Sequence, residues 1–210
     1  MKKKVFNLII VDESGSMSCI QKQAFSGMNE TLATVRSMQE KYPDTDQRVT
    51  LVTFDSNHTT WHYDDAQAEA TEDLKWGQYN PGGCTPLYDA MGRAITKVEA
   101  QTQEGDSVLV TVITDGEENS SHEWRLSMIR RLIERLKERG WTFALIGTDN
   151  LDVESMADSM SISEHLCFCQ SAEGTKEMFR RERRARERFV CYSASDNSDP
   201  MPKGHLFDED

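Results

Sequence analysis

The chain alternates short apolar runs with amphipathic stretches along most of its length. Val5–Val11 is β-branched and apolar except at Asn7, and Ser107–Thr114 has the same character. Such runs are typical of strands that are buried on both faces of a parallel sheet. Arg48–Phe54 alternates apolar and polar residues, and Thr59–Tyr63 follows after a tight connection, which indicates an antiparallel hairpin at a sheet edge.

The stretches between these runs carry apolar residues at helical spacing. Ala66–Leu74 fits either a short helix or an irregular excursion. We expect helices over Ile20–Lys41, from Thr85 to Val98, over His122–Arg139 and over Val153–Ser159, and shorter strands over Thr142–Ile146 and Glu164–Phe168. The alternation predicts an α/β fold of the Rossmann-like kind. Its sheet is doubly wound and mostly parallel with one antiparallel edge strand, and helices cover both faces.

The last part of the chain has a different character. Gly174–Phe189 is helical in pattern, and its segment Arg180–Arg188 holds six arginines and two glutamates. We interpret the arginines as a solvated helix face with Glu–Arg pairs, the alternative being a dock for an acidic partner or for the chain's own acidic tail. From Tyr192 onward the sequence is polar and acidic, which predicts disorder. The expected division is therefore a domain over 1–172, an arginine-rich helix over 173–190 and a tail over 191–210.

The composition narrows the range of functions. Hydrophobic residues make up 37% of the 210 positions, which is enough for one core. The net charge of −12 argues against nucleic-acid binding, and no apolar run is long enough for a membrane span. The start MKKKVFNLIIV imitates a signal peptide but lacks a small-residue cleavage site, and the five cysteines form no CxxC pairs. We therefore expect a cytoplasmic protein with reduced thiols.

Oxygen-bearing side chains follow the two most apolar strands. Asp12, Ser14 and Ser16 come directly after the first strand, Asp115 ends the strand Ser107–Thr114, and Thr85 follows a glycine-rich loop. Carboxyl ends of neighbouring parallel strands meet at one edge of the sheet, where ligands bind. Hydroxyl and carboxylate oxygens suit Mg²⁺ or Mn²⁺, and the absence of His or Cys ligands near them disfavours zinc.

These motifs together resemble the von Willebrand factor A domain, also called the integrin I-like domain. The resemblance lies in the sequences DESGS with Asp12, GGCTPL with Thr85 and TDGE with Asp115, in the family's order and strand context, and it covers Lys3–Gln170. The likeness implies the family's metal-ion-dependent adhesion site, here in an intracellular protein of bacterial type. The metal-binding positions would be Asp12, Ser14, Ser16, Thr85 and Asp115.

The resemblance also implies a role for each of these positions. Ser14 and Ser16 would ligate the metal directly, Thr85 directly or through water, and Asp12 and Asp115 mostly through water. One coordination position would stay open for a carboxylate from a partner protein. Resembling intracellular domains act as adaptors for larger assemblies, including AAA ATPases. The expected function is therefore a metal-dependent protein-binding module and not an enzyme.

Other interpretations stay open at this point. Each oxygen residue alone could cap a helix or serve a turn. A Mg²⁺-dependent phosphatase or nuclease would use the same acidic edge, but it needs a nucleophile or base that the sequence does not place there. A structural domain with a vestigial site is the third alternative. Glu117 and Glu118 fit solvated surface charge better than a tuning role beside the site. Asp149 fits a loop role or the rim of the site, and Asp55 either faces the site or closes the hairpin. Trp124 and Tyr79 are candidate exposed partner contacts.

Overall fold

The computed structural model describes residues 2–195 and 206–207. Within these residues the chain folds around a six-stranded sheet with the order β3-β2-β1-β4-β5-β6. All neighbouring strands run parallel except β2 and β3, so β3 is an antiparallel edge strand. The predicted doubly wound sheet is confirmed. The strands are β1 (Lys3–Asp12), β2 (Thr45–Phe54), β3 (Thr59–Gln67), β4 (Ser107–Thr114), β5 (Thr142–Thr148) and β6 (Glu164–Phe168).

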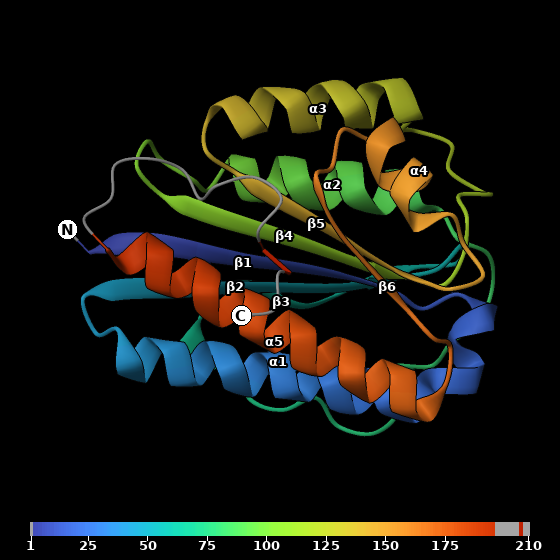
Figure 1. The fold of residues 1–210 in the computed structure, drawn as a ribbon, viewed down its shortest axis with the longest axis horizontal. Coiled ribbons are helices and arrows are strands. Elements are labelled where there is room, and N and C mark those ends of the chain that lie inside the picture. Colours follow the sequence, from blue (N-terminus) through green and yellow to red (C-terminus); the bar gives the residue numbers. More distant parts are fainter. Residues whose placement is uncertain (1, 196–205, 208–210) are drawn as a thin grey trace.

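Helices cover both faces of the sheet, as Figure 1 shows. One face carries α1 (Gln21–Lys41) and α5 (Ala172–Ala194), and the other carries α2 (Leu87–Glu99), α3 (Leu126–Glu138) and α4 (Val153–Ser159). Two 3₁₀ turns, η1 (Gly15–Ile20) and η2 (Ala68–Ala70), complete the elements of the described residues. None of the helices in this part of the chain has the length and apolar character that a membrane span requires.

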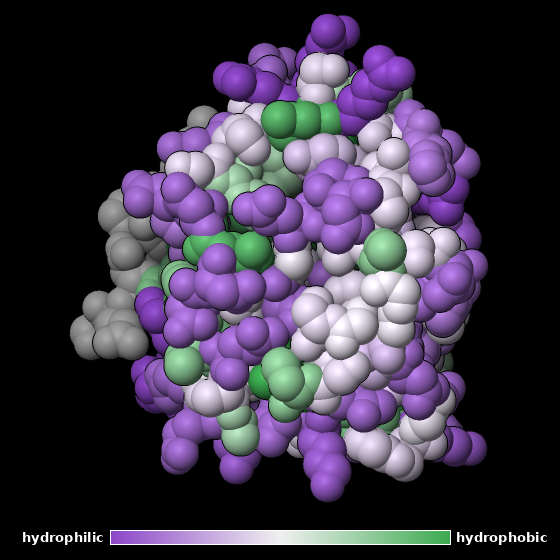
Figure 2. Space-filling model, turned by 90° about the vertical axis from the view of Figure 1, so that its right-hand side faces the viewer, coloured by the Kyte–Doolittle hydropathy of each residue, from purple (hydrophilic) through white to green (hydrophobic). Residues whose placement is uncertain are grey.

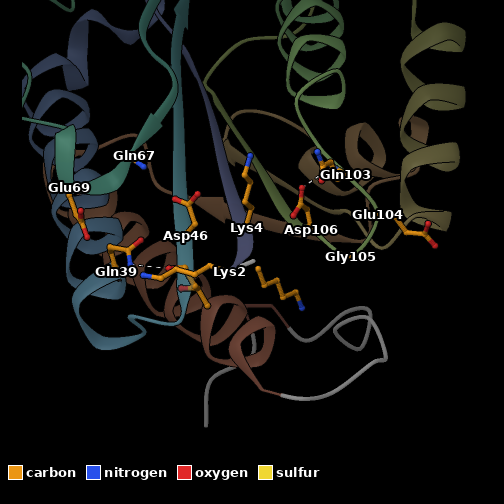
Figure 3. A pocket seen from close by; sticks show the side chains of 12 residues that line it. Lys2, Lys4, Gln39, Asp46, Gln67, Glu69, Gln103, Glu104, Gly105 and Asp106 are labelled. Carbon is orange, nitrogen blue, oxygen red and sulfur yellow. Dashed lines mark hydrogen bonds between the residues drawn. The ribbon is translucent and has the colours of Figure 1, made fainter.

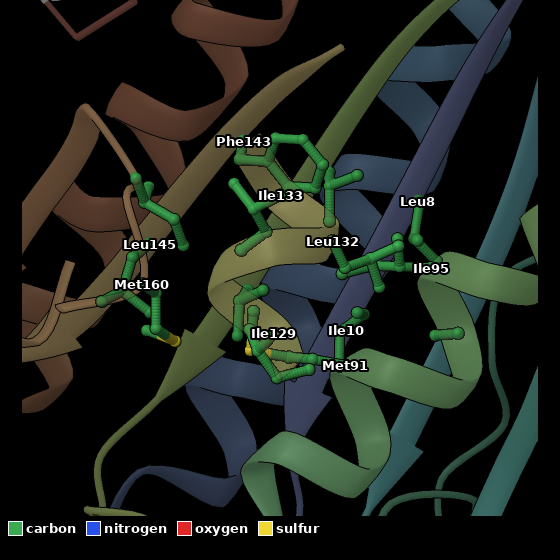
Figure 4. Packing of buried hydrophobic residues seen from close by; sticks show 14 of the residues in the cluster. Leu8, Ile10, Met91, Ile95, Ile129, Leu132, Ile133, Phe143, Leu145 and Met160 are labelled. Atoms are coloured by element: carbon green, nitrogen blue, oxygen red, sulfur yellow. The ribbon is translucent and has the colours of Figure 1, made fainter. Parts of the chain in front are cut away.

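The central strand β1 is apolar on both faces because each face packs against a helical layer. Leu8 and Ile10 lie in the cluster that α2, α3 and α4 cover, and Figure 4 shows them facing Met91 and Ile95 of α2. Ile9 and Val11 point to the opposite face, toward α1 and α5. The period of two along the strand thus supplies two cores at once, as the continuous apolar run predicts.

Several element boundaries differ from the predicted ones. The third helix begins at Leu126 and not at His122, because Ser121 does not cap it; the Ser121 hydroxyl donates to Glu118 Oε2 at 2.6 Å. The strand β2 starts at Thr45, where the polar residues hid it from the pattern. The ambiguous stretch after Tyr63 continues β3 to Gln67 and then forms η2.

The C-terminal helix α5 is longer than expected. Ser171 caps it by accepting the Gly174 N–H at 3.0 Å, and the helix runs to Ala194, so residues 191–194 form its last turn and no disordered tail. Of the expected tail, Leu206 is buried, and positions 196–205 and 208–210 lie outside the described residues. Arg186 is also buried, which corrects the interpretation of all six arginines as solvated.

Candidate metal centre

The two apolar strands that precede the predicted metal-binding residues are neighbours. Strands β1 and β4 pair in parallel, with Val11 beside Ile113, so that Asp12 and Asp115 end at the same edge. The backbone N–H of Ser14 donates to Asp12 Oδ1 at 2.7 Å, which forms the turn after β1. The Ser14 and Ser16 hydroxyls lie 3.1 Å apart, and the Ser16 hydroxyl donates to Asp115 Oδ1 at 2.7 Å.

Thr85 reaches the same place from a different part of the chain. The Gly15 N–H donates to the Gly83 carbonyl at 3.1 Å, which ties the glycine-rich loop to the turn after β1. A methyl group built on Gly116 would lie 3.0 Å from Thr85 Oγ1 and 3.8 Å from Asp12 Oδ2. The Thr85 hydroxyl and the Asp12 carboxylate therefore border one small space. The structure brings all five predicted residues together.

Burial sets the electrostatics of this cluster. Asp12 is fully buried, and burial raises its pKa from 3.8 to about 6, against hydrogen bonds from Thr114 and Ser14 that lower it. Burial likewise raises the pKa of Asp115, opposed by hydrogen bonds from Ser16 and Gln170. No cationic side chain contributes to either shift. The two carboxylates thus hold negative charge in a poorly solvated place without a protein counter-charge, which a cation would supply.

The donors present fit a hard divalent cation. They are hydroxyl and carboxylate oxygens, the ligands that Mg²⁺ and Mn²⁺ take in proteins. Among the residues of 2–195 and 206–207, no three or more His, Cys, Asp and Glu side chains gather in a group able to hold a metal. A zinc site or a carboxylate-rich nuclease site would need such a group. A site made of two acids and three hydroxyls does not need one.

Side chains outside the predicted metal-binding set complete the cluster. The Thr114 hydroxyl donates to Asp12 Oδ2 at 2.6 Å, Gln170 Nε2 donates to Asp115 Oδ2 at 2.6 Å, and the Tyr79 hydroxyl donates to the Asp12 carbonyl at 2.7 Å. Thr114 could have been found from its place beside Asp115. Gln170 and Tyr79 come from loops, where no periodic pattern indicates which side chain points inward.

Glu13 fastens the glycine-rich loop to the strand end. Its Oε1 accepts the Asn80 N–H at 2.5 Å, and its backbone carbonyl accepts the Gly82 N–H at 2.9 Å. The side chain is buried, and Oε2 has no hydrogen-bond partner within the described residues. A buried acid at the second position of the DESGS motif therefore holds in place the loop that presents Thr85.

The acids near the cluster mainly brace loops. Glu118 accepts the N–H groups of Tyr88, Ser120 and Ser121, so it is no freely solvated surface charge. Asp55 accepts the Asn57 and His58 N–H groups at 2.7 and 2.8 Å and closes the β2–β3 hairpin.

Asp149 touches a neighbour of the cluster, whereas Glu117 is a surface residue. Asp149 Oδ1 accepts the Gln170 N–H at 3.2 Å, which links Asp149 to the residue that contacts Asp115. Glu117 is exposed, in keeping with solvated surface charge.

The aromatic residues proposed as partner contacts are not exposed. Tyr79 is 1% exposed, and Trp124 is half-buried against the core at Gly92. Trp76 is 60% exposed and packs edge-to-face on Phe25 with the ring centroids 5.2 Å apart. The exposed aromatic surface thus lies at Trp76, in the segment that leads to Tyr79.

The candidate metal centre lies at one end of the molecule. Figure 2 looks onto the end at which the parallel strands finish, and this surface is largely hydrophilic with small apolar patches. Ser16 is exposed here while Asp12 and Ser14 are buried beneath it, so the cluster opens to solvent on the Ser16 side.

A separate polar hollow of about 670 Å³ lies at the start of the strands. Figure 3 shows Lys4 there between Asp46 and Asp106, and the remaining lining residues also mix both charges. The mixture favours neither an anion nor a cation as a ligand.

Among residues 2–195 and 206–207, the hydrogen bonds of the cluster involve no histidine. The negative charge of Glu13 raises the pKa of His62, but burial of the ring lowers it by more. The His62 Nε2 atom lies 3.0 Å from Thr53 Oγ1, within hydrogen-bond distance. None of the hydrogen bonds to Asp12, Ser14, Ser16 or Asp115 described above comes from a histidine or lysine. Within the described residues, the clustered oxygens fit a cation, and no hydrogen-bonded histidine or lysine is placed there to act as an acid or a base.

Comparisons with known proteins agree with this fold. The sequence profile of the von Willebrand factor type A domain matches residues 8–181. The PilB minor pilin from Streptococcus sanguinis is similar in structure, with a TM-score of 0.64 at 11% identity over 93% of this chain, which spans 64% of that pilin. The SpRpn10 VWA domain gives a TM-score of 0.58 at 13% identity, covering 87% of this chain and 95% of that one. No curated protein sequence matches the chain.

Proposed function

Because the chain belongs to the von Willebrand factor type A domain family, whose members are commonly protein-interaction modules and not enzymes, we propose that it binds a partner protein through a divalent metal ion. The metal would be Mg²⁺ or Mn²⁺, held by Ser14, Ser16 and Thr85 with Asp12 and Asp115 in support. The single observation that carries the proposal is the convergence of these five oxygen side chains at one strand edge.

The chemistry of the cluster supports a bridging role. A cation held by three neutral hydroxyls retains much of its charge, so it attracts an incoming carboxylate. The Ser16 side is exposed, which gives a partner carboxylate a way in. We propose an acidic side chain of another protein as the bridging group, and an AAA ATPase or a larger assembly as the kind of partner.

The proposed setting is the cytoplasm. All five cysteines are free and exposed, which fits a reducing compartment. The von Willebrand factor A fold does not by itself indicate where in the cell a protein is located. The fold also occurs in the vWF domain of the type V pili tip protein Mfa5 from Porphyromonas gingivalis.

Titration calorimetry of Mg²⁺ and Mn²⁺ into chelator-treated protein tests the proposal. We expect saturable binding to the wild type and a loss of about tenfold or more in affinity for the Ser14→Ala/Ser16→Ala variant. Ser18→Ala is the matched control, because the Ser18 hydroxyl belongs to the same turn but donates to the Gly15 carbonyl at 2.7 Å. A folded wild type that binds neither metal would contradict the proposal.

The bridging step needs a second measurement. Partner capture from a cell extract should require both Mg²⁺ and intact Ser16, and Ser18→Ala should capture as well as wild type. Capture that persists in chelator would show binding through a surface other than the metal centre.

A further inference from the structure

The dipeptide Leu206–Phe207, which follows α5 in the sequence, docks onto the body of the domain. Leu206 is 1% exposed and belongs to a buried cluster that β1, β4, β5, α1 and α5 all contribute to. The cluster consists of Val5, Met38, Leu109, Ala144, Ala185, Phe189, Val190 and Leu206. Phe207 is half-buried and packs against both this cluster and the neighbouring one around Ile9.

Side chains of the domain also recognise the backbone of this dipeptide. The Leu206 N–H donates to Glu164 Oε2 at 3.0 Å, and the Leu206 carbonyl accepts from Arg188 Nη2 at 3.0 Å. The Phe207 carbonyl accepts from Arg181 Nη2 at 3.4 Å. Glu164 is itself only 6% exposed, so it meets the dipeptide in a place with little water. An apolar surface flanked by fixed donors and acceptors is how domains recognise short peptide segments.

We propose that this surface, the C-terminal docking site formed by Glu164, Arg181, Arg188 and the members of the apolar cluster other than Leu206, is a binding site for a short segment. That segment has an aliphatic and an aromatic residue followed by acids. In the isolated chain the occupant is its own Leu206–Phe207, which Asp208, Glu209 and Asp210 follow in the sequence. The arginines of α5 match such acids in charge. The same segment supplied from outside competes for the site.

The docking site is separate from the metal centre. Leu206 packs with Val5, which precedes Asp12 by seven positions on β1, or about 23 Å along the strand. A failure of metal binding therefore leaves this inference untouched, and the reverse holds as well.

The test uses the full chain with its own segment disabled. The variant Leu206→Ala/Phe207→Ala is titrated with a fluorescent peptide of residues 203–210, KGHLFDED. We expect saturable binding to the variant and at least tenfold weaker binding to wild type, because the attached segment competes at a high effective concentration. The control peptide KGHAADED should bind neither protein.

Two further variants check which side chains recognise the peptide. Arg188→Gln, combined with the double variant, should weaken peptide binding several-fold. Arg183→Gln should not, since Arg183 pairs with Glu187 on the exposed side of α5. A folded double variant that binds neither peptide, or binds both equally well, would overturn the proposal. Should the double variant fail to fold, Phe207→Ala alone removes the half-buried side chain. The Phe207→Ala variant should then bind KGHLFDED at least threefold more tightly than wild type does. An affinity equal to that of wild type would overturn the proposal.

Discussion

Asp12 combines full burial with hydrogen bonds to two of its neighbours. Thr114 and the Ser14 backbone each donate to one of its carboxylate oxygens, at 2.6 and 2.7 Å. Its pKa of about 6 still lies above the ordinary value, because loss of solvation outweighs these bonds. At the proposed metal site a proton and a metal ion would therefore compete for this buried carboxylate near neutral pH.

This competition predicts how metal affinity depends on pH. Above pH 6 Asp12 is ionised and the affinity should be constant, while below pH 6 the metal must displace a proton, and the affinity should fall by about tenfold per pH unit. Calorimetric titrations between pH 5 and 8 measure this dependence. Thr114→Val removes a hydrogen bond that favours the charged form of Asp12. In this variant the pH below which the metal affinity falls should therefore be higher. If the metal affinity of this variant begins to fall at the same pH as in the wild type, the pH dependence does not come from Asp12.

Glu13 shows how a residue outside the ligand set can position it. Glu13→Ala removes the acceptor of the Asn80 N–H, which frees the loop that carries Thr85. We expect metal affinity to fall by about 10–100-fold. Glu13→Gln keeps a carbonyl oxygen for Asn80 and should lose less than about threefold. Calorimetry reports affinity and thermal melting reports stability. A Glu13→Ala variant with lower stability but unchanged affinity would assign Glu13 a purely structural role.

At the scale of the elements, the sequence predicts those with a clean period and misses the limits of those that are polar. The strand around Ile9 follows directly from its apolar run, and Asp12 follows from its place at the end of that run. The start of β2 was missed because Thr45 and Gln47 are polar, yet both are buried and joined by a hydrogen bond of 3.0 Å. A run of polar residues in the sequence does not reveal that their side chains hydrogen-bond to each other and can therefore be buried.

The packing of α1 on α5 depends on one small residue. A methyl group at Gly27 would lie 2.0 Å from the ring of Phe179, so the helices approach each other closely at this point. Gly27→Ala improves helix propensity by about 1 kcal/mol, but the clash should cost more and leave a net loss of about 1–3 kcal/mol. Chemical denaturation measures the change in unfolding free energy. The control is Ser26→Ala at the neighbouring exposed position, which should change stability by less than about 0.5 kcal/mol. A more stable Gly27→Ala variant would mean that the two helices separate readily.

At the scale of the whole molecule, Arg186 joins α5 to the centre of the sheet. It is fully buried, donates to Asn7 of β1 at 2.8 Å and to Thr111 of β4 at 3.0 Å, and forms an ion pair with Glu182. Thr31 of α1 donates to Glu182 in turn at 3.3 Å. Sequence periodicity could not separate Arg186 from the exposed arginines around it, because the distinction depends on which polar groups of the distant strands face the helix.

This network predicts a large asymmetry between breaking the ion pair and replacing it. Arg186→Met leaves the Glu182 carboxylate buried without its cation and should cost about 3–5 kcal/mol of unfolding free energy. Replacing both, in Glu182→Leu/Arg186→Met, removes the unpaired charge and should recover a large part of that loss.

Denaturant unfolding of Arg186→Met, of Glu182→Leu and of the double variant gives the coupling energy of the pair. Arg183→Met is the matched control, since Arg183 forms an exposed pair with Glu187 and its loss should cost less than about 1 kcal/mol. If Arg186→Met cost no more than Arg183→Met, α5 would be held to the sheet by its apolar residues alone. The buried arginine would then contribute nothing to the attachment of the helix.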